Sequence, residues 1–299
     1  MVLVVGSTGK LGRAIVWRLR MDGVVVRALV RPASDVVVLR DSGAELVVGD
    51  LRNAESLRRA CQGCDAVVTT ASSLHTSTGF DPEWTDRNGN LNLIEAARLE
   101  NVGHVVFTST IGADALDAPR VFRNKRLIEE HLAASGLRHT ILRPAGFMEN
   151  LLPLILWARR TGIAVIPRPG TTKTSYIAIR DIAEMARLVV VVSPPRPASV
   201  IEFGGPEDLS ILDCVTMLQE ALGRRLHVWR VPLTPLRWIG RMARPFNQAP
   251  DALLEIVEFV EQKGLRADKS FLSAYPITLT SFRSFSREQL ELERQKQSR

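Results

Sequence analysis

The sequence predicts an α/β fold in which a doubly wound parallel sheet is joined to a smaller C-terminal lobe. Three observations support this fold. An apolar run, a glycine turn and a helical pattern follow one another at the start of the chain, strand and helix patterns then alternate to residue 143, and the alternation weakens beyond it. Continuous apolar strands separated by helices are typical of parallel sheets covered on both faces, and right-handed connections wind such a sheet in both directions.

The glycine turn is the most informative segment. The apolar run Val2–Val5 leads into three glycines spaced three residues apart, and a helical pattern follows. Glycine permits a tight turn and a close approach of the backbone to a pyrophosphate, and the helix presents unpaired N–H groups to it. The alternative is an ordinary strand–helix junction with packing glycines. The predicted phosphate-binding residues are Gly6, Ser7, Thr8, Gly9, Lys10, Leu11 and Gly12.

The alternating part of the chain divides into strands and helices by its apolar patterns. The expected strands are residues 2–5, Val24–Val30, Glu45–Val48, Ala66–Thr70, His104–Thr108 and His139–Leu142. The expected helices are residues 10–22, 34–42, 53–62, 84–100 and 121–135. Ligands of such a sheet bind at the carboxyl ends of the strands, near the switch in strand order.

The C-terminal part has a less regular pattern. Its expected elements are a loop and apolar helix over 145–160, strands over Ser175–Ile179 and Val200–Phe203, helices over Arg180–Val192 and 210–222, the segment Leu226–Val231 after the second of these helices, and a helix with a frayed tail from Arg283. We therefore expect a dinucleotide-binding domain over residues 1–150, to which residues 174–204 return. A smaller lobe for a substrate or partner is expected over 151–173 and 205–299.

The end of the second strand predicts which dinucleotide binds. An acidic residue near this point accepts the ribose 2′-hydroxyl in NAD sites, but Arg31 stands here instead. A guanidinium suits a 2′-phosphate, and Arg13, just after the glycine turn, is in a position to reach the same group. The alternative for both is an exposed surface arginine. The sequence therefore predicts NADP(H).

The ends of the third and fourth strands add contacts to the same ligand. Asp50 closes the third strand, where its carboxylate can accept from an adenine amino group and the Leu51 N–H can add a contact. A helix N-cap is the alternative role of Asp50. The small residues Thr70, Ala71 and Ser72 follow the fourth strand and leave room for the ribose and pyrophosphate.

Several motifs occur in order over residues 1–205. They are Gly6–Gly12, Gly49–Leu51, Gly89 with Asn92–Ala97, Thr108-Ser109, Asn124-Lys125 with Glu129, Leu142–Pro144 with Phe147–Asn150, and Arg180–Ala183. In these motifs the chain resembles the short-chain dehydrogenase/reductase superfamily, in its atypical NmrA-like branch. The resemblance implies a Rossmann-type sheet that binds NAD(P).

One departure from the classical members of that superfamily concerns the catalytic acid. They use Tyr-x-x-x-Lys, in which the lysine lowers the phenol pKa. Lys125 is present, but Val121 occupies the tyrosine position, and the chain has two tyrosines, Tyr176 and Tyr275, both far away in sequence. Atypical relatives without this tyrosine include reductases of conjugated alkenes and quinones, dinucleotide-binding redox sensors and photosystem assembly factors.

The remaining site residues follow from the motifs. Lys125 can hold the nicotinamide ribose hydroxyls or protonate a reduced acceptor, and the alternative is a lysine on a helix surface. Ser109 and Thr108 are expected to line the nicotinamide or to cap the strand end. Substrate contacts are expected from Phe147, Met148 and Asn150, although the first two equally suit a hydrophobic core.

Two functions are consistent with these residues. The first is an NADPH-dependent reductase of a small, apolar, electron-poor acceptor such as a quinone or enone. The second is a non-catalytic NADP(H)-binding redox sensor or photosystem-assembly-type factor that binds a protein partner. The missing tyrosine favours the second function, whereas the retained lysine and the apolar C-terminal lobe favour the first.

Charge and hydropathy restrict the partners and the location. The net charge is +7, but the arginines are scattered, so a nucleic-acid partner is not expected. The apolar run Leu188–Val192 is short and is closed by Ser193-Pro194-Pro195, so no membrane-spanning segment is expected. The first strand begins at once, with no signal peptide, which predicts a cytoplasmic protein.

Other candidate motifs carry less weight. Cys61 and Cys64 match Cys-x-x-Cys but end a helix, where the dipole opposes a thiolate. The histidines show no ligand spacing, so no metal is expected. The segment 229–246 is basic and aromatic. It is expected to cover the ligand-binding cleft, or alternatively to make a peripheral contact with a membrane surface or a partner.

Overall fold

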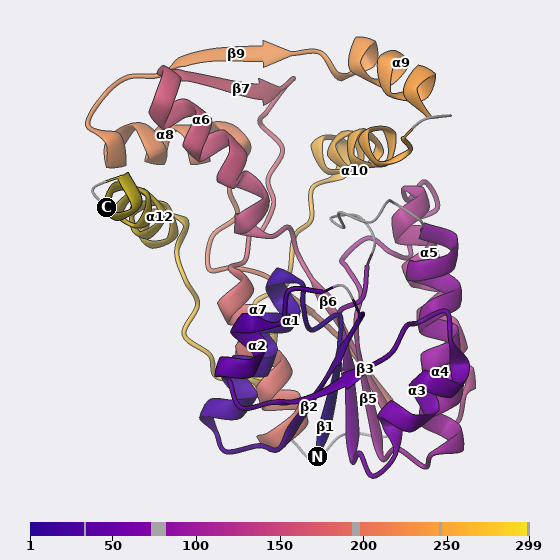
Figure 1. Cartoon of the computed structure of the whole chain (residues 1–299). Helices are drawn as coiled ribbons and strands as arrows, with labels where there is room; N and C mark the ends of the chain where they lie inside the picture. Colours follow the sequence, from indigo (N-terminus) through magenta and orange to yellow (C-terminus); the bar gives the residue numbers. More distant parts are fainter. Residues whose placement is uncertain (33, 73–81, 193–197, 245–246, 298–299) are drawn as a thin grey trace. The chain divides into compact units, whose positions relative to one another are not determined.

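The computed structural model describes residues 1–32, 34–72, 82–192, 198–244 and 247–297 (Figure 1). These residues form two compact units, which are considered separately below. The first unit comprises Met1–Arg143, Ile182–Glu202 and Phe271–Ile277, and the second comprises Pro144–Asp181, Phe203–Ser270 and Thr278–Arg299.

The first unit contains a seven-stranded sheet with the strand order β3-β2-β1-β4-β5-β6-β8. The strands are β1 (Val2–Val5), β2 (Val26–Val30), β3 (Glu45–Val48), β4 (Ala66–Thr69), β5 (His104–Thr108), β6 (His139–Pro144) and β8 (Ala198–Phe203). Strands β1 to β6 pair in parallel. The strand order reverses between β1 and β4, and ligands of doubly wound sheets bind at this point. The predicted fold class is confirmed.

Helices cover both faces of this sheet (Figure 1). On one face lie α3 (Ala54–Cys61), α4 (Gly89–Leu99) and α5 (Arg120–Ala134), and on the other lie α1 (Lys10–Met21), α2 (Val37–Asp41) and α7 (Ile179–Arg187). The core under the first three helices includes Leu57, Leu93 and Ile128, which pack against apolar strand residues. On the opposite face, Arg187 pairs with Asp22 at 2.7 Å and so ties α7 to the end of α1.

The second unit is built mainly from helices around a short parallel ribbon, β7 (Ile163–Pro167) and β9 (His227–Val231). Its core includes Met148, Ile155, Val215 and Phe282. The remaining helices of the chain are η2 (Met148–Leu151), α6 (Leu152–Thr161), α8 (Ile211–Leu222), α9 (Leu233–Ala243), α10 (Ala249–Lys263), α11 (Phe271–Ala274) and α12 (Phe282–Gln297). Among the described residues, no helix is both long and apolar enough to cross a bilayer.

The structure corrects the expected strand over Ser175–Ile179. Its alternating pattern is β-like, but the backbone groups bond to separate segments instead of one neighbouring strand. The Ser175 N–H donates to Leu265 O, and the Ile177 N–H donates to Gly146 O, both at 2.9 Å. Only isolated bridges result, one of them between Phe147 and Ile177. The partners come from distant parts of the chain, so the local pattern could not show this.

Two expected helices also have different bounds. The helix expected over 84–100 is a π-helical segment, η1 (Pro82–Asn88), followed by α4. The helix expected over Arg180–Val192 ends as an α-helix at Arg187 and continues as a second π-helical segment, η3 (Leu188–Val192). The segment Ser193–Pro195, expected to close the apolar run, lies outside the described residues.

The buried His104 predicts how acid affects the fold. It begins β5, and its Nε2 lies 3.0 Å from Thr140 Oγ1. Burial lowers the pKa of His104 to about 4, whereas an unfolded histidine has a pKa of about 6.5. The unfolded state therefore takes up the proton first. Stability contributed by this residue is fully present above about pH 6.5 and is lost as the pH falls towards 4.

We expect the free energy of unfolding to fall by about 3 kcal/mol from this residue over that pH range. His104→Gln removes this part of the acid dependence because glutamine cannot take up the proton, and urea unfolding at several pH values measures it. The exposed His227→Gln is the matched control. An identical acid dependence in wild type and His104→Gln would contradict the assignment.

Candidate functional site

The glycine turn follows β1 at the switch in strand order, and its shape is set by close backbone packing. Gly6 has a φ of +77°, and a Cβ built there would lie 2.7 Å from Thr70 Oγ1. A Cβ on Gly12 would lie 2.1 Å from Gly6 O. Both positions therefore require glycine for the turn itself. At Gly9 a Cβ would have one neighbour within 4 Å, Gly6 O at 3.3 Å, which is a tight contact but far less restrictive than those at Gly6 and Gly12.

The start of α1 is suited to bind an anion. Gly9 is its N-cap and offers no side-chain acceptor to the first N–H groups of the helix. Unpaired N–H groups and the positive end of the helix dipole bind phosphate at such a position. The exposed Gly9 backbone leaves space for a pyrophosphate to approach. The turn therefore fits the diphosphate of a dinucleotide.

The other residues predicted in this turn divide by exposure. Ser7 is buried, and its hydroxyl donates to Leu29 O at 2.6 Å, so its side chain joins β1 to β2. Leu11 is buried as well, whereas Lys10 is exposed and Thr8 is half-buried. Ser7 and Leu11 can thus contribute their backbone N–H groups to a ligand, and Thr8 and Lys10 can also contribute side chains.

The loop after β2 brings two arginines to one place. Arg31 begins this loop and is exposed. Arg13, from the first turn of α1, crosses to the same loop, where its Nη2 lies 3.3 Å from Asp35 O and 3.7 Å from the Asp35 carboxylate. The Arg13 Nε is buried and has no acceptor among the described residues. A guanidinium with an unused donor beside Arg31 fits a phosphate.

Sequence reasoning missed Asp35, the acidic residue in this loop. Its carboxylate accepts from the Val37 N–H at 3.2 Å, at the start of α2, and faces Arg13. The signal available in the sequence was its position four residues after Arg31. Asp35 is therefore the acidic partner of Arg13 in this structure.

The ends of β3 and β4 lie at the same edge of the sheet as the turn, with β4 next to β1 and β3 beyond β2. Asp50 is partly exposed, and its carboxylate accepts from the Arg52 N–H at 2.8 Å. Leu51 is buried, and its carbonyl accepts from Asn92. Thr70 Oγ1 donates to Val5 O at 3.3 Å, which holds the end of β4 against the end of β1. These contacts leave the Asp50 carboxylate partly open to a ligand.

Ala71 and Ser72 continue the chain after β4. Ala71 is buried, and the Ser72 hydroxyl donates to the Asp86 carboxylate at 3.4 Å. Asn90 donates to Asp86 O at 2.6 Å and accepts from Thr69 Oγ1 at 2.8 Å. This buried network fixes the end of β4. Asp86 and Asn90 were missed because the expected helix over 84–100 gave them no partner.

The end of β5 contains the candidate catalytic residues. Lys125 lies on α5, and its Nζ donates to Thr108 O at 2.8 Å and lies 5.3 Å from the centroid of the Phe107 ring. The hydroxyls of Thr108 and Ser109 are buried and have no hydrogen-bond partner among the described residues. Buried hydroxyls without partners are costly, so this arrangement suits a bound polar group.

The environment of Lys125 changes its acidity. Protein atoms surround the ammonium, and this desolvation lowers the pKa of Lys125 below its usual range. The carboxylates of Asp86 and Glu129 act in the opposite direction and partly offset the effect. An ammonium with a lowered pKa donates its proton more readily at neutral pH.

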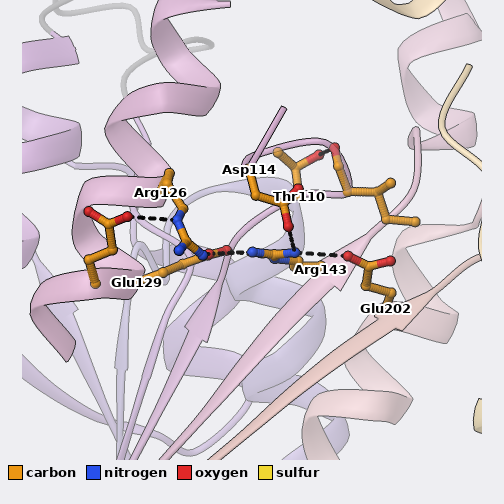
Figure 2. Close-up of polar contacts among 8 residues, drawn as sticks. Thr110, Asp114, Arg126, Glu129, Arg143 and Glu202 are labelled. Atoms are coloured by element: carbon orange, nitrogen blue, oxygen red, sulfur yellow. Dashed lines mark hydrogen bonds and ion pairs between the residues drawn. The ribbon is translucent and has the colours of Figure 1, made fainter. Parts of the chain in front are cut away.

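A buried ion-pair cluster holds α5 against the sheet (Figure 2). Arg143, at the end of β6, donates to both carboxylate oxygens of Glu129, at 2.9 and 2.6 Å. Its Nη1 also donates to Asp114 at 2.7 Å and to Glu202 at 2.9 Å. Glu129 lies one turn after Lys125 on α5, so this cluster determines where Lys125 lies. Sequence reasoning noted Arg143 and Glu129 in separate motifs but did not predict their contact.

The position of the classical tyrosine is filled by core packing. Val121 lies in the first turn of α5 and is buried. Tyr176 belongs to the second unit, where burial raises its pKa well above the usual range. A buried phenol with a raised pKa has little tendency to ionise.

The expected substrate residues belong to the second unit. Met148 is buried in the core of that unit. Phe147 is half-buried and forms the isolated bridge with Ile177, and Asn150 is exposed. Phe147 and Asn150 thus have surface available for a ligand, whereas the Met148 side chain is used in packing.

The cysteines have the properties of buried structural thiols. Burial raises the pKa of Cys61 to about 12 and also raises that of Cys64. Reactive cysteines have the opposite shift. The described residues do not include His75. Among them, no group of three or more potential metal ligands occurs.

Comparison with known proteins identifies the family. The sequence matches the NAD(P)H-binding family over residues 6–190. It is 32% identical to the NAD(P)H azoreductase of Xenophilus azovorans over 225 residues, 75% of this chain and 74% of that protein. It is 29% identical to the photosystem II assembly factor Ycf39 of Synechocystis over 271 residues, 89% of this chain and 82% of that protein.

Solved structures share the fold. The NADPH complex of the quinone oxidoreductase QOR2 from Escherichia coli matches with a TM-score of 0.81 at 20% identity, over 96% of this chain and 99% of that chain. The triphenylmethane reductase of Citrobacter matches with a TM-score of 0.82 at 17% identity, over 97% and 99%. The chain belongs to the NAD(P)H-binding family and is of the atypical, NmrA-like type of short-chain dehydrogenase/reductase. The expected NAD(P) ligand is thereby confirmed.

The glycine turn allows a sharp test of the phosphate site. We expect Gly9→Val to leave the fold intact, because Gly6 O is the one neighbour within 4 Å and a small backbone shift relieves that contact, but to abolish NADPH binding by filling the space of the pyrophosphate. Gly12→Ala instead destabilises the fold, because its Cβ meets Gly6 O. Calorimetric titration with NADPH and thermal unfolding measure the two effects. A folded Gly9→Val variant with unchanged NADPH affinity would mean that the dinucleotide binds elsewhere.

Proposed function

We propose that this protein is an NADPH-dependent reductase of a small, apolar, electron-poor acceptor such as a quinone or an enone. The observation that carries the proposal is the arrangement at the end of β5, where the Lys125 ammonium lies on Thr108 O beside two buried hydroxyls without partners. NADPH supplies a hydride when bound. The acceptor gains this hydride and one proton, and the cofactor leaves as NADP⁺.

The residues of the chain have distinct roles in this proposal. The glycine turn and the start of α1 bind the pyrophosphate. Ser109 and Thr108 orient the nicotinamide half with their hydroxyls. Lys125 holds the ribose hydroxyls or gives the proton to the reduced acceptor, directly or through a water. Phe147 and Asn150 are the proposed contacts of the acceptor.

The absence of a phenol acid limits the acceptor class. With Val121 in the tyrosine position, a simple ketone would receive no proton from the usual donor. A quinone or enone gives a stabilised anion after hydride transfer and depends less on an acid. The similarity to an azoreductase supports an electron-poor acceptor.

A non-catalytic NADP(H) sensor or assembly factor is the second candidate. Two observations favour it: Val121 in place of the catalytic tyrosine, and the 29% identity to a photosystem II assembly factor over 89% of the chain. This function requires a protein partner and NADPH binding without turnover. Incubation of the pure protein with NADPH and a panel of quinones and enones separates the two functions. Only a reductase oxidises NADPH and so lowers the absorbance of the reduced nicotinamide.

The first prediction from this proposal concerns the choice of dinucleotide. Arg31 and Arg13 pair with the 2′-phosphate, so NADPH binds more tightly than NADH by about 1–3 kcal/mol. Arg31→Ala removes most of that difference and leaves NADH binding nearly unchanged. Asp35→Asn tightens NADPH binding, because it removes the competing charge and keeps an oxygen for the Val37 N–H.

Calorimetric titration with both dinucleotides measures these effects, and Arg40→Ala, an exposed arginine on α2, is the control. Equal affinities of the wild type for NADPH and NADH would refute the 2′-phosphate assignment.

The second prediction concerns Lys125. If the lysine is the acid, Lys125→Met lowers turnover by roughly 10²–10⁴-fold. The wild-type rate falls as the pH rises through the lowered pKa of Lys125, because the ammonium loses its proton, and the variant lacks this dependence. Steady-state rates with a quinone over a pH series measure both effects. Leu127→Ala, partly exposed on the same helix, is the control.

A smaller loss of turnover together with a weaker NADPH affinity would assign Lys125 to ribose binding. Robust oxidation of simple secondary alcohols by the wild type would contradict the proposal, because that reaction needs an acid–base residue that this site lacks.

A further inference from the structure

Helix α9 in the second unit exposes its apolar side. Figure 1 shows β9 leading to α9, with α10 beside it. Trp238, Ile239 and Met242 are 65, 64 and 77% exposed. Together with Pro235 they have the spacing i, i+3, i+4 and i+7, so they form one stripe along the helix. An amphipathic helix of a globular protein normally buries such a stripe.

The opposite side of α9 packs against α10 of the same unit. Gly240 allows close packing, since a Cβ there would lie 3.2 Å from Leu254 on α10. Arg237 forms an ion pair with Glu258 and lies 3.9 Å from Glu255, both on α10. The helix is therefore held by its charged side, which leaves the apolar stripe outward.

The ribbon that precedes α9 in the chain also exposes apolar side chains. Trp229 on β9 pairs in register with Val165 on β7, and the two side chains are 60 and 43% exposed. Pro232 alone separates β9 from α9. We call the exposed stripe of α9 and this strand pair the apolar surface.

The unpaired charge in the segment that carries the apolar surface is positive. Between Glu220 and Asp251 the sequence contains six arginines and no acidic residue. Arg225, Arg230 and Arg241 are exposed and have no acidic partner among the described residues. A stripe with tryptophan and methionine beside unpaired arginines is complementary to an anionic surface with an apolar interior.

We propose that the apolar surface docks on an anionic lipid bilayer. Trp229, Trp238 and Met242 enter the boundary between headgroups and acyl chains, and Arg241 lies against lipid phosphates. No described helix is able to span the bilayer, so the contact is peripheral. This inference is independent of the proposed reductase activity.

Vesicle flotation tests the proposal with the whole protein. We expect binding to vesicles of equal phosphatidylcholine and phosphatidylglycerol, weak binding to pure phosphatidylcholine, and a loss of binding at high salt. Trp238→Ser and Arg241→Glu each weaken binding by about tenfold or more. Met21→Ser and Arg40→Glu, exposed residues of the first unit, are the matched controls and leave binding unchanged.

A second measurement places the tryptophans directly and needs no destabilising variant. Lipids brominated in the acyl chain should quench tryptophan fluorescence, and a Trp229→Phe and Trp238→Phe double variant should lose this quenching. Equal binding to both kinds of vesicle, or no vesicle binding at low salt, would overturn the proposal. Dimerisation that Trp238→Ser disperses would overturn it as well, by showing that a second copy covers the surface.

Discussion

The first unit depends on the buried ion pair between Arg143 and Glu129. Both residues are less than 5% exposed, and two parallel hydrogen bonds join them. A buried charge is tolerated only when it is paired and hydrogen-bonded, so neither residue can leave the contact cheaply. Asp114 and Glu202, which are about half exposed, complete the coordination of Arg143. The pair thus joins β6, α5, β8 and the loop after β5.

The chemistry of the site follows from this constraint. Glu129 and Lys125 are four residues apart on α5 and therefore lie on one face of the helix. When Glu129 binds Arg143 at the end of β6, Lys125 reaches Thr108 at the end of β5. The Glu129 carboxylate also favours the charged form of Lys125 and so raises its pKa, whereas desolvation lowers it. One ion pair therefore sets the position of the candidate catalytic residue, whereas desolvation is the main influence on its acidity, with Asp86 and then Glu129 acting against it.

The sequence was sufficient for features that depend on local patterns. The glycine turn, the alternating strands and the family motifs predicted the sheet and the phosphate site, because chain-local spacing and backbone sterics determine them. Features that depend on partners from distant segments were missed. The Ser175–Ile179 segment shows this, since its bonds go to Gly146 and Leu265 and not to one strand.

The candidate site divides in the same way. Gly6 and Gly12 were predictable as turn glycines from their spacing, whereas Asp35, Asp86 and the contact of Arg143 with Glu129 depend on how separate elements pack. The sequence showed that the segment containing α9 is basic and aromatic, but it did not show which side of the helix faces outward. Packing of Arg237 and Gly240 against α10 turns the apolar side outward, whereas periodicity alone predicts that this side is buried.

A double-mutant cycle on Glu129 and Arg143 tests the central claim most directly. Urea unfolding would compare Glu129→Gln, Arg143→Met and the double variant with the wild type. We expect Glu129→Gln to cost about 3–5 kcal/mol, because it leaves a buried guanidinium poorly paired, and the double variant to be more stable than the sum of the two losses by about 1–3 kcal/mol. Losses that add to within about 0.5 kcal/mol would show that the pair does not hold α5 in place.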